Sequence, residues 1–330
     1  MQVLERDFRE TVDRYLELHD PSAGGDVAAR KESYAEMVTG YYDLVTDIFE
    51  YGWGDSFHFA PRFRDEAFHA SISRHQHFLA ARMGLRPGLR ALDVGCGIGG
   101  PMRGVARFSG AHVLGVNNNA YQIGKAIEKN REAGLDHLCE LLESDFMQMP
   151  IEDGAMNAAY AFEATCHAPD KTALFREIHR VIEPGGLFGA YEWCLTDRYD
   201  ASDAEHRRIK RFIMEGDGLP DIWTIEATKQ CLRDAGFEIL EVEDRALSSD
   251  RETPWYLPMT PRERSFTGLR RTKLGRRITW LAMTAMERAK MVPPGTRAVS
   301  TFLHRGADAL VAGGETGIFT PMLWFLARKP

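Results

Sequence analysis

The chain has 330 residues, of which 44% are hydrophobic and 27% charged, as is ordinary for a soluble globular protein of one or two domains. Its formal net charge of −7 argues against a nucleic-acid binder, because such proteins are usually basic. The five cysteines are widely spaced and form no CxxC pair, so we expect reduced thiols and no zinc site.

The N-terminal part of the chain is polar with spaced apolar residues. Residues 1–10 lack the apolar stretch of a signal peptide, and no run of about 18 apolar residues occurs anywhere, so we expect a cytoplasmic protein without a transmembrane segment. The pattern over residues 1–40 predicts amphipathic helix, with a turn at 21–26. Residues 41–60 are rich in aromatic side chains and are expected to be irregular, and a further helix is expected at 66–83.

Strands alternate with helices from residue 90 onwards, which is typical of an α/β fold whose parallel sheet has helices on both faces. The strands that we expect are 90–94, 112–116, 138–143, 157–162, 187–193, 237–244 and 321–328. The helices that we expect are 101–108, 120–133, 170–181 and 224–235. The sequence Glu-Pro-Gly-Gly at 183–186 is expected to break the chain before the fifth strand.

A glycine-rich loop, Asp-Val-Gly-Cys-Gly-Ile-Gly-Gly at 93–100, follows the first of these strands. Glycine lets a backbone turn tightly and approach a ligand closely. The position just past the carboxyl end of a strand is where open α/β sheets bind cofactors. Because the same glycines fit the GxGxxG fingerprint, the loop alone indicates an adenosine-containing cofactor and leaves NAD open.

Three details favour S-adenosylmethionine over NAD. Asp93 precedes the glycines, where a carboxylate can meet the aminoacyl end or the sulfonium side of that molecule. The second strand ends in asparagines at 117–119 instead of the acidic residue that NAD domains use, although amides also bond a ribose diol. Asp145 can accept from the adenine amine while Phe146 packs on the ring. The residues expected to hold the co-substrate are Asp93, Gly95, Cys96, Gly97, Gly99, Asn117, Asn118, Gln122, Asp145, Phe146 and Glu163.

The segment at 246–320 lies between the last two expected strands and is basic in its middle, from Arg262 to Arg277. Apolar residues including Ile278 and Trp280 follow. A basic stretch that leads into an apolar helix can dock on an anionic membrane surface, but the favoured interpretation is a solvated helix that packs its apolar face on the core. Any peripheral membrane contact is therefore placed at residues 260–290.

Four stretches of the sequence resemble sterol 24-C-methyltransferases, nearest the plant cycloartenol type. They are Tyr51–Phe59, Leu92–Pro101 with Asn117–Gln122, Glu163–Pro169, and a C-terminal group at 191–197, 216–220 and 319–330. The resemblance covers roughly residues 34–330, and Met156-Asn157 in place of the usual Phe-Asp departs from it. It implies a Rossmann-like class I methyltransferase with an N-terminal helical cap at 1–84, a cofactor domain at 85–245 and a sterol methyltransferase C-terminal region at 246–330, in which 321–330 returns to the sheet.

The resemblance implies methylation of a sterol side-chain alkene at carbon 24 in sterol biosynthesis, through a carbocation, a hydride shift and a deprotonation. The sterol would be cycloartenol-like, lanosterol-like or zymosterol-like. Such a reaction depends on positioning and needs no metal, and the His and Cys spacing suggests none. A C-methyltransferase acting on another prenyl-like or lipid acceptor is the alternative. Intact Asp93, Glu163 and His167 argue against a binding protein without catalysis, and a homo-oligomer is left open.

Two sets of residues are expected to carry this chemistry, although each of them is also open to a plain structural role. Aromatic faces stabilise a carbocation without trapping it. The aromatic candidates are Tyr51, Trp53, Phe57, Tyr191 and Trp193. The final proton is very acidic, so geometry matters more than the pKa of the base. The candidates for the base are Glu163, His167, His58 and Glu192. One of the two acids, Glu163 or Glu192, can instead form a hydrogen bond with the sterol 3-hydroxyl. Cys96 and Cys166 are expected to be buried packing residues.

Overall fold

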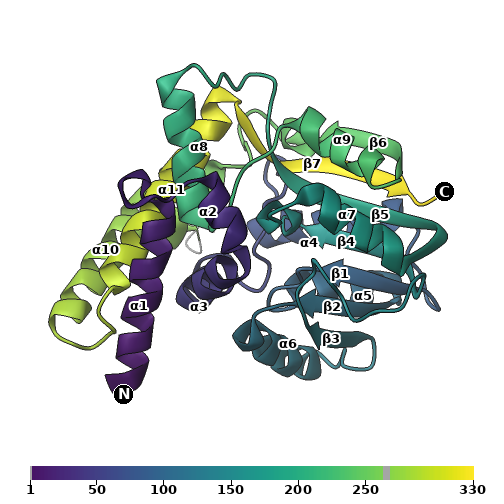
Figure 1. The fold of residues 1–330 in the computed structure, drawn as a ribbon, viewed down its shortest axis with the longest axis horizontal. Helices are drawn as coiled ribbons and strands as arrows, with labels where there is room; N and C mark the ends of the chain where they lie inside the picture. The colour runs from purple at the N-terminus through teal and green to yellow at the C-terminus, as the bar shows by residue number, and fades with distance from the viewer. Residues whose placement is uncertain (1, 263–267) are drawn as a thin grey trace. The chain divides into compact units, whose positions relative to one another are not determined.

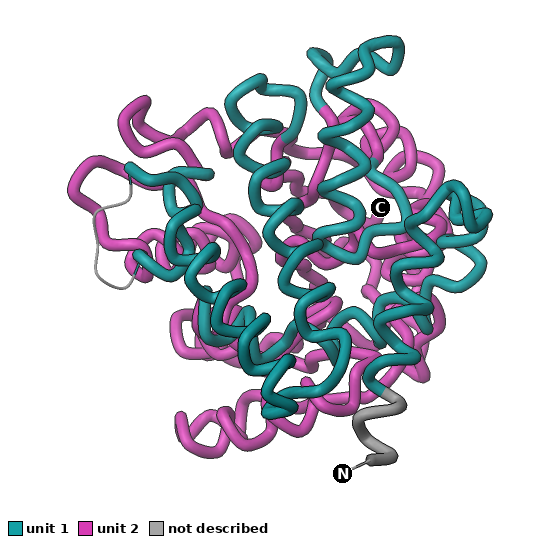
Figure 2. Tube along the Cα trace, turned by 90° about the vertical axis from the view of Figure 1, so that its left-hand side faces the viewer, with its two compact units in different colours: residues 1–52, 196–222, 256–319 teal, residues 53–195, 223–255, 320–330 magenta. Residues whose placement is uncertain are grey.

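The computed structural model describes residues 2–262 and 268–330 (Figure 1). The chain divides into two compact units, which Figure 2 draws in different colours. Unit 1 comprises residues 1–52, 196–222 and 256–319, and unit 2 comprises residues 53–195, 223–255 and 320–330. The three-part division at residues 84 and 245 stays a prediction.

Unit 2 is built around a seven-stranded sheet with the strand order β3-β2-β1-β4-β5-β7-β6. The strands are β1 (Arg90–Val94), β2 (His112–Asn117), β3 (Cys139–Glu143), β4 (Met156–Phe162), β5 (Ile182–Leu195), β6 (Glu238–Asp244) and β7 (Phe319–Arg328). The pairs among β1 to β5 are parallel, whereas β7 runs antiparallel to β6. The expected α/β sheet is confirmed, and the strand at the end of the chain returns to it.

β5 begins earlier than expected, so the prediction of a break at 183–186 was wrong. Ile182 already pairs with Met156, and the ladder continues after a register shift. Gly185 has a φ of 82°, a left-handed conformation that glycine tolerates without a steric penalty. The Glu-Pro-Gly-Gly sequence therefore forms an irregularity within the strand.

Helices cover both faces of the sheet. On one face, α4 (Phe68–Arg82) and α5 (Gly100–Ser109) bury residues such as Leu79 and Val105, while α7 (Lys171–Val181) and α9 (Ile225–Asp234) bury Phe175 and Leu232 on the other. Full burial of such an apolar side chain contributes about 1.5–3 kcal/mol. Other elements of this unit are α6 (Ala120–Glu132), η2 (Thr165–His167) and η3 (Arg245–Ser248).

Unit 1 consists of helices. They are α1 (Gln2–His19), η1 (Pro21–Ala23), α2 (Val27–Glu32), α3 (Tyr34–Trp53), α8 (Ala204–Asp217), η4 (Leu257–Met259), η5 (Leu269–Arg271), α10 (Lys273–Arg288) and α11 (Thr296–Thr316). Tyr15, Tyr41 and Phe302 join α1, α3 and α11, with ring centroids 5.0–6.2 Å apart. α8 and α11 meet so closely that a Cβ on Gly216 would lie 2.3 Å from the Cα of Gly306.

The prediction that residues 41–60 are irregular was wrong for their first part, because α3 extends to Trp53. Its buried side chains recur at a helical spacing (Val38, Tyr41, Val45), which the many aromatic and glycine residues of the segment obscured. Residues 54–60 do lie outside helices and strands. Within the described residues, no helix has the length and apolar character that crossing a membrane requires.

Candidate active site

The glycine loop lies at the carboxyl end of β1 and turns directly into α5. Gly95, Gly97 and Gly99 all have a positive φ, between 54° and 77°. A Cβ on Gly95 would come 2.5 Å from the Cβ of Ala164, so the loop packs against the segment that follows β4. A Cβ on Gly97 would meet nothing within 4 Å. The loop is therefore packed at Gly95 and open at Gly97, where a ligand could approach the backbone closely.

Asp93 ends up inside the protein, with 1% of its surface exposed. Burial raises the pKa of its carboxyl to about 8, and the Tyr160 hydroxyl works in the opposite direction with a smaller effect. Its Oδ2 makes no hydrogen bond within the described part of the chain. A buried acceptor without a partner is costly, and a cationic or hydrogen-bonding ligand group would relieve it. The unpartnered Oδ2 beside the loop is chemically suited to the aminoacyl end or sulfonium of S-adenosylmethionine.

Asn117 ends β2 next to the glycine loop. Its Nδ2 donates to Gly97 O at 3.4 Å and to Gln122 Oε1 at 2.7 Å. Gln122 is buried and orients this amide, which is a supporting role. Asn119 caps α6 by accepting from the Gln122 backbone N–H at 2.8 Å. Asn118 lies between them and is half-buried.

The segment after β3 joins the same edge of the sheet. The Ser144 N–H donates to Asn117 O at 2.9 Å. Asp145 Oδ1 accepts from the Met147 N–H at 2.8 Å, and Phe146 is half-buried against the core on the α7 and α9 face. The ends of β1, β2 and β3 thus bring the expected cofactor residues together at one edge.

Glu163 immediately follows β4 and adopts a strained backbone conformation. Its φ is 55°, which is uncommon for a residue other than glycine and costs on the order of 1–3 kcal/mol. Its buried carboxylate accepts from the Phe59 N–H through Oε1 and from the Trp193 indole N–H through Oε2, both at 2.8 Å. Glu163 is thus the chain neighbour of Ala164, the residue that packs on the glycine loop at Gly95.

The rings beside Glu163 form an aromatic cluster, which we define as Trp53, Phe59, Trp193 and Trp255. Phe59 is its centre, with ring centroids 5.7 Å from Trp53, 6.2 Å from Trp193 and 4.9 Å from Trp255. The sequence analysis did not predict Trp255, which lies far along the chain outside every motif. Phe59 lies within the aromatic motif at 51–59 but was not among the individual candidates. In unit 2 the carboxylate of Glu163 is therefore bonded directly to one ring of this cluster, Trp193.

Two of the expected aromatic residues do not belong to this cluster as defined. Tyr51 belongs to unit 1, is 59% exposed, and carries the Arg270 guanidinium 4.7 Å from its ring centroid. Tyr191 is fully buried and stacks on His75 with 3.6 Å between centroids. The structure thus places Tyr191 in the core. Phe57 is half-buried just before His58.

His58 is buried and both of its ring nitrogens are engaged. Nδ1 lies 2.7 Å from Phe59 O, an obligate acceptor, so Nδ1 carries the proton. Nε2, 2.9 Å from Gln76 Nε2, then accepts from that amide. Burial lowers the pKa of His58 to about 4. The imidazole is therefore neutral and holds the Phe59 backbone in place.

Glu192 is paired with a buried lysine. Its carboxylate is 0% exposed and lies 2.7 Å from Lys171 Nζ, which is 1% exposed. Burial is the largest single influence and lowers the pKa of Lys171, but the charge and hydrogen bond of Glu192, together with Cys194 and Cys166, raise this pKa above its ordinary value. The Thr165 hydroxyl and the backbone N–H of Trp193 also donate to the Glu192 carboxylate. His167, at the end of η2, is buried as well.

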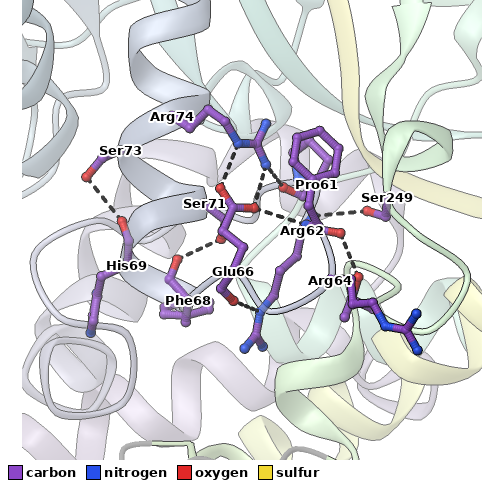
Figure 3. A network of polar contacts seen from close by, with 12 residues as sticks. Pro61, Arg62, Arg64, Glu66, Phe68, His69, Ser71, Ser73, Arg74 and Ser249 are labelled. Carbon is purple, nitrogen blue, oxygen red and sulfur yellow. Dashed lines mark hydrogen bonds and ion pairs between the residues drawn. The ribbon is translucent and has the colours of Figure 1, made fainter.

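The segment that carries Phe59 is held at both ends. Asp55 forms ion pairs with Arg103 at 2.8 Å and Lys129 at 3.0 Å, which tie the segment to α5 and α6. Further along, Figure 3 shows both carboxylate oxygens of Glu66 facing the guanidinium of Arg74, at 2.7 and 2.8 Å. Arg74 also donates to Pro61 O at 2.6 Å.

Both thiols near the site donate to backbone carbonyls, Cys96 to Gly97 O at 3.8 Å and Cys166 to Glu163 O at 3.1 Å. All five cysteines are buried and none of them forms a disulfide. Across residues 2–262 and 268–330, His, Cys, Asp and Glu side chains form no group of three or more suited to a metal ion.

Comparison with known proteins gives two family matches and full-length relatives. A model described as the sterol methyltransferase C-terminal region matches residues 266–330, and a methyltransferase domain model matches residues 92–190. Cycloartenol-C-24-methyltransferase 1 of Oryza sativa subsp. japonica is 48% identical over 329 residues, which cover 100% of this chain and 95% of that protein. The sterol 24-C-methyltransferase of Saccharomyces cerevisiae is 43% identical, over 98% of this chain and 86% of that protein.

Solved structures share the fold. A cyclopropane synthase from Mycobacterium tuberculosis superimposes with a TM-score of 0.68 at 16% identity, covering 89% of this chain and 98% of that one. A geranyl diphosphate C-methyltransferase from Streptomyces coelicolor gives 0.64 at 18% identity, covering 90% and 98%. At these identities the likeness concerns the fold alone.

Proposed function

The chain belongs to the sterol 24-C-methyltransferase family of S-adenosylmethionine-dependent enzymes, and we propose that it methylates carbon 24 of a Δ24 sterol through a carbocation. The observation that carries the mechanism is the position of Glu163. Its carboxylate joins the aromatic cluster through Trp193, and its neighbour Ala164 packs on the cofactor loop at Gly95.

The edge formed by β1, β2 and β3 is the proposed cofactor site. Asp93 and the open side of Gly97 would hold the aminoacyl part, and Asn118 and Asp145 would bond the nucleoside, with Phe146 against the adenine. When bound, S-adenosylmethionine supplies an electrophilic methyl group. The protein must then hold the sterol alkene in line with that methyl, because a weak nucleophile reacts only when it is well oriented.

We propose that the aromatic cluster lines the place where positive charge develops. Each ring face stabilises a cation by about 0.5–2 kcal/mol and offers no lone pair that would trap it. Methyl transfer leaves the charge at carbon 25, and a hydride shift from carbon 24 moves it to carbon 24. Loss of a proton from the new methyl group then gives the methylene product.

Glu163 is our candidate for the group that receives this proton. Its carboxylate accepts hydrogen bonds from the Phe59 N–H and the Trp193 indole N–H, and such donors favour the ionised form that can receive a proton. His58 has both ring nitrogens engaged, and Glu192 is neutralised by Lys171. These contacts support structural roles for His58 and Glu192 and leave His167 as the second candidate.

Incubation with methyl-labelled S-adenosylmethionine and a panel of acceptors tests the activity. The panel contains cycloartenol, lanosterol, zymosterol, desmosterol and a 24-methylene sterol, together with non-sterol prenyl lipids. We expect label in the side chain of at least one Δ24 sterol, located at carbon 24 by mass spectrometry or NMR. Label only in a non-sterol acceptor would instead support a C-methyltransferase acting on another lipid.

A further inference from the structure

The outer face of α10 is an apolar stripe on the surface of unit 1. Leu274, Ile278 and Leu281 are 61%, 55% and 54% exposed. Their spacing, continued by Ala285, places them along one side of the helix. Leu269 before α10 and Met291 after it are 50% and 71% exposed and lengthen the stripe at both ends. Exposed aliphatic residues that are contiguous in this way mark an interaction surface, whereas scattered ones do not.

The inner face of α10 is already occupied by α11. Trp280 Nε1 donates to Thr301 Oγ1 at 2.9 Å, and Arg276 pairs with Asp308. Glu287, the single acidic residue of α10, accepts from the Arg297 N–H at 2.6 Å. The helix is thus anchored by its polar contacts on one side and turns its aliphatic side chains outward.

Basic residues flank the stripe. Lys273, Arg277, Arg288 and Lys290 are all exposed, and Arg277 and Arg288 lie beside the apolar side chains on the helix surface. Residues 269–291 contain seven Lys or Arg and one Glu, although the whole chain has a net charge of −7. The positive charge is therefore concentrated where the aliphatic residues are exposed.

From this arrangement we propose that α10 lies in the surface of an anionic lipid bilayer, with its stripe in the acyl boundary and its cations on the headgroups. An amphipathic helix with aliphatic residues on one side and Lys or Arg beside them has this preference (Figure 1 shows α10 in yellow-green). A second copy of the chain is a poorer occupant, because a two-fold interface through this stripe would bring the basic residues that flank it in one copy close to those of the other.

Flotation of the purified full-length chain with lipid vesicles tests the proposal. Vesicles of phosphatidylcholine alone are compared with vesicles that also contain phosphatidylserine, at low and high salt and without sterol or S-adenosylmethionine. We expect binding to the anionic vesicles that salt weakens. Binding that is equal on both vesicles and indifferent to salt would overturn the proposal, as would no binding. Neither result touches the methyl transfer.

Two double variants locate the surface. Ile278→Asp with Leu281→Asp should abolish flotation, and Arg277→Glu with Arg288→Glu should weaken it at least about tenfold, since each basic residue near an anionic surface contributes about 1 kcal/mol, or roughly a fivefold change in affinity. The matched controls are Leu247→Asp, at a residue 82% exposed outside the stripe, and Arg131→Glu on α6. Thermal unfolding verifies that each variant folds.

The same variants separate a lipid surface from a self-interface. We measure sedimentation velocity of the unaltered chain and of the double variant Ile278→Asp with Leu281→Asp. The two proteins should show the same oligomeric state. An oligomer that this pair of substitutions dissociates, with vesicle flotation unchanged, would assign the stripe to a second copy and overturn the lipid assignment. Equal loss of flotation in the Leu247→Asp control would do the same, because binding would then not depend on α10.

Discussion

The Trp193 indole donates its N–H to Glu163 Oε2 at 2.8 Å, so one side chain of the aromatic cluster holds the carboxylate that we assign to the chemistry. The bond joins β5 to the residue after β4. A charge-assisted hydrogen bond of this kind is stronger than a neutral one. The aromatic cluster and the carboxylate are therefore directly bonded, and substitutions at Glu163 and at Trp193 can test the two separately.

Glu163→Gln is expected to lower kcat by about 10²–10⁴-fold, because the amide cannot receive the proton and carries no charge opposite the cation. The affinity for S-adenosylmethionine should change much less. Single-turnover rates and equilibrium binding of the co-substrate measure the two effects. Glu183→Gln, on the exposed start of β5, is the control. Near-normal turnover in Glu163→Gln would remove Glu163 from the mechanism.

Trp193→Phe keeps an aromatic face but removes the donor to Glu163. We expect kcat to fall by roughly tenfold, since the lost hydrogen bond to a charged group contributes about 1.5–3 kcal/mol, only part of which is felt in the transition state. Trp193→Leu should fall further because the π face is lost as well. Rates and thermal stability of both variants measure this. Equal rates for the two would argue that the ring has no role with the cation.

Lys171→Met should destabilise the fold by about 3–5 kcal/mol, because it leaves the buried Glu192 carboxylate without its partner. The double variant Lys171→Met with Glu192→Gln is expected to recover much of this loss. Chemical denaturation of the unaltered chain, the two single variants and the double variant gives the coupling energy between Lys171 and Glu192. Our assignment of Glu192 to a structural role also requires that the folded double variant keeps kcat within about tenfold. A folded Glu192→Gln variant without activity would restore Glu192 as a catalytic candidate.

Asp93→Asn is expected to stabilise the free protein at neutral pH and to weaken binding of S-adenosylmethionine. The folded pKa is about 8 and the ordinary value is 3.8, so folding at pH 7 takes up a proton. The contribution of the Asp93 carboxyl to the free energy of unfolding is fully present below pH 3.8 and is lost as the pH rises towards 8. The gain in Asp93→Asn should be roughly 1–3 kcal/mol at pH 7 and vanish near pH 4. Thermal unfolding across pH measures it, and a pH-independent gain would contradict the ionisation argument.

His58 contributes a pH dependence of the opposite sign. Its pKa is lowered from 6.5 to about 4 by burial, so the unfolded chain binds the proton more readily. The stability is fully present above pH 6.5 and is lost as the pH falls towards 4, by on the order of 2–3 kcal/mol. His58→Asn, whose amide can donate in place of Nδ1, should flatten this slope. His112→Gln, at the exposed start of β2, is the control and should leave the slope as it is.

Much of unit 2 could be read directly from the sequence. The glycine loop, the alternation of strands and helices and the asparagines after β2 are local signals, because hydrophobic period and turn residues act over a few positions. These signals predicted the α/β sheet and S-adenosylmethionine as the methyl donor, whereas the sterol acceptor was predicted from the resemblance to a known family. Residues 41–53 were misjudged because aromatic side chains masked a helical period, and the start of β5 because a glycine turn looked like a break.

The sequence by itself therefore determined the fold class, the position of the glycine loop after the first strand and, through the resemblance, the family. Only the tertiary structure decided which candidate residues contact one another, since the donors to Glu163 come from residues 104 and 30 positions away along the chain. It also brought in Trp255, paired Lys171 with Glu192 and left Tyr51 in the other unit. The physical reason is that local patterns encode burial and turns, whereas contacts between distant residues depend on how the strands are ordered in the sheet.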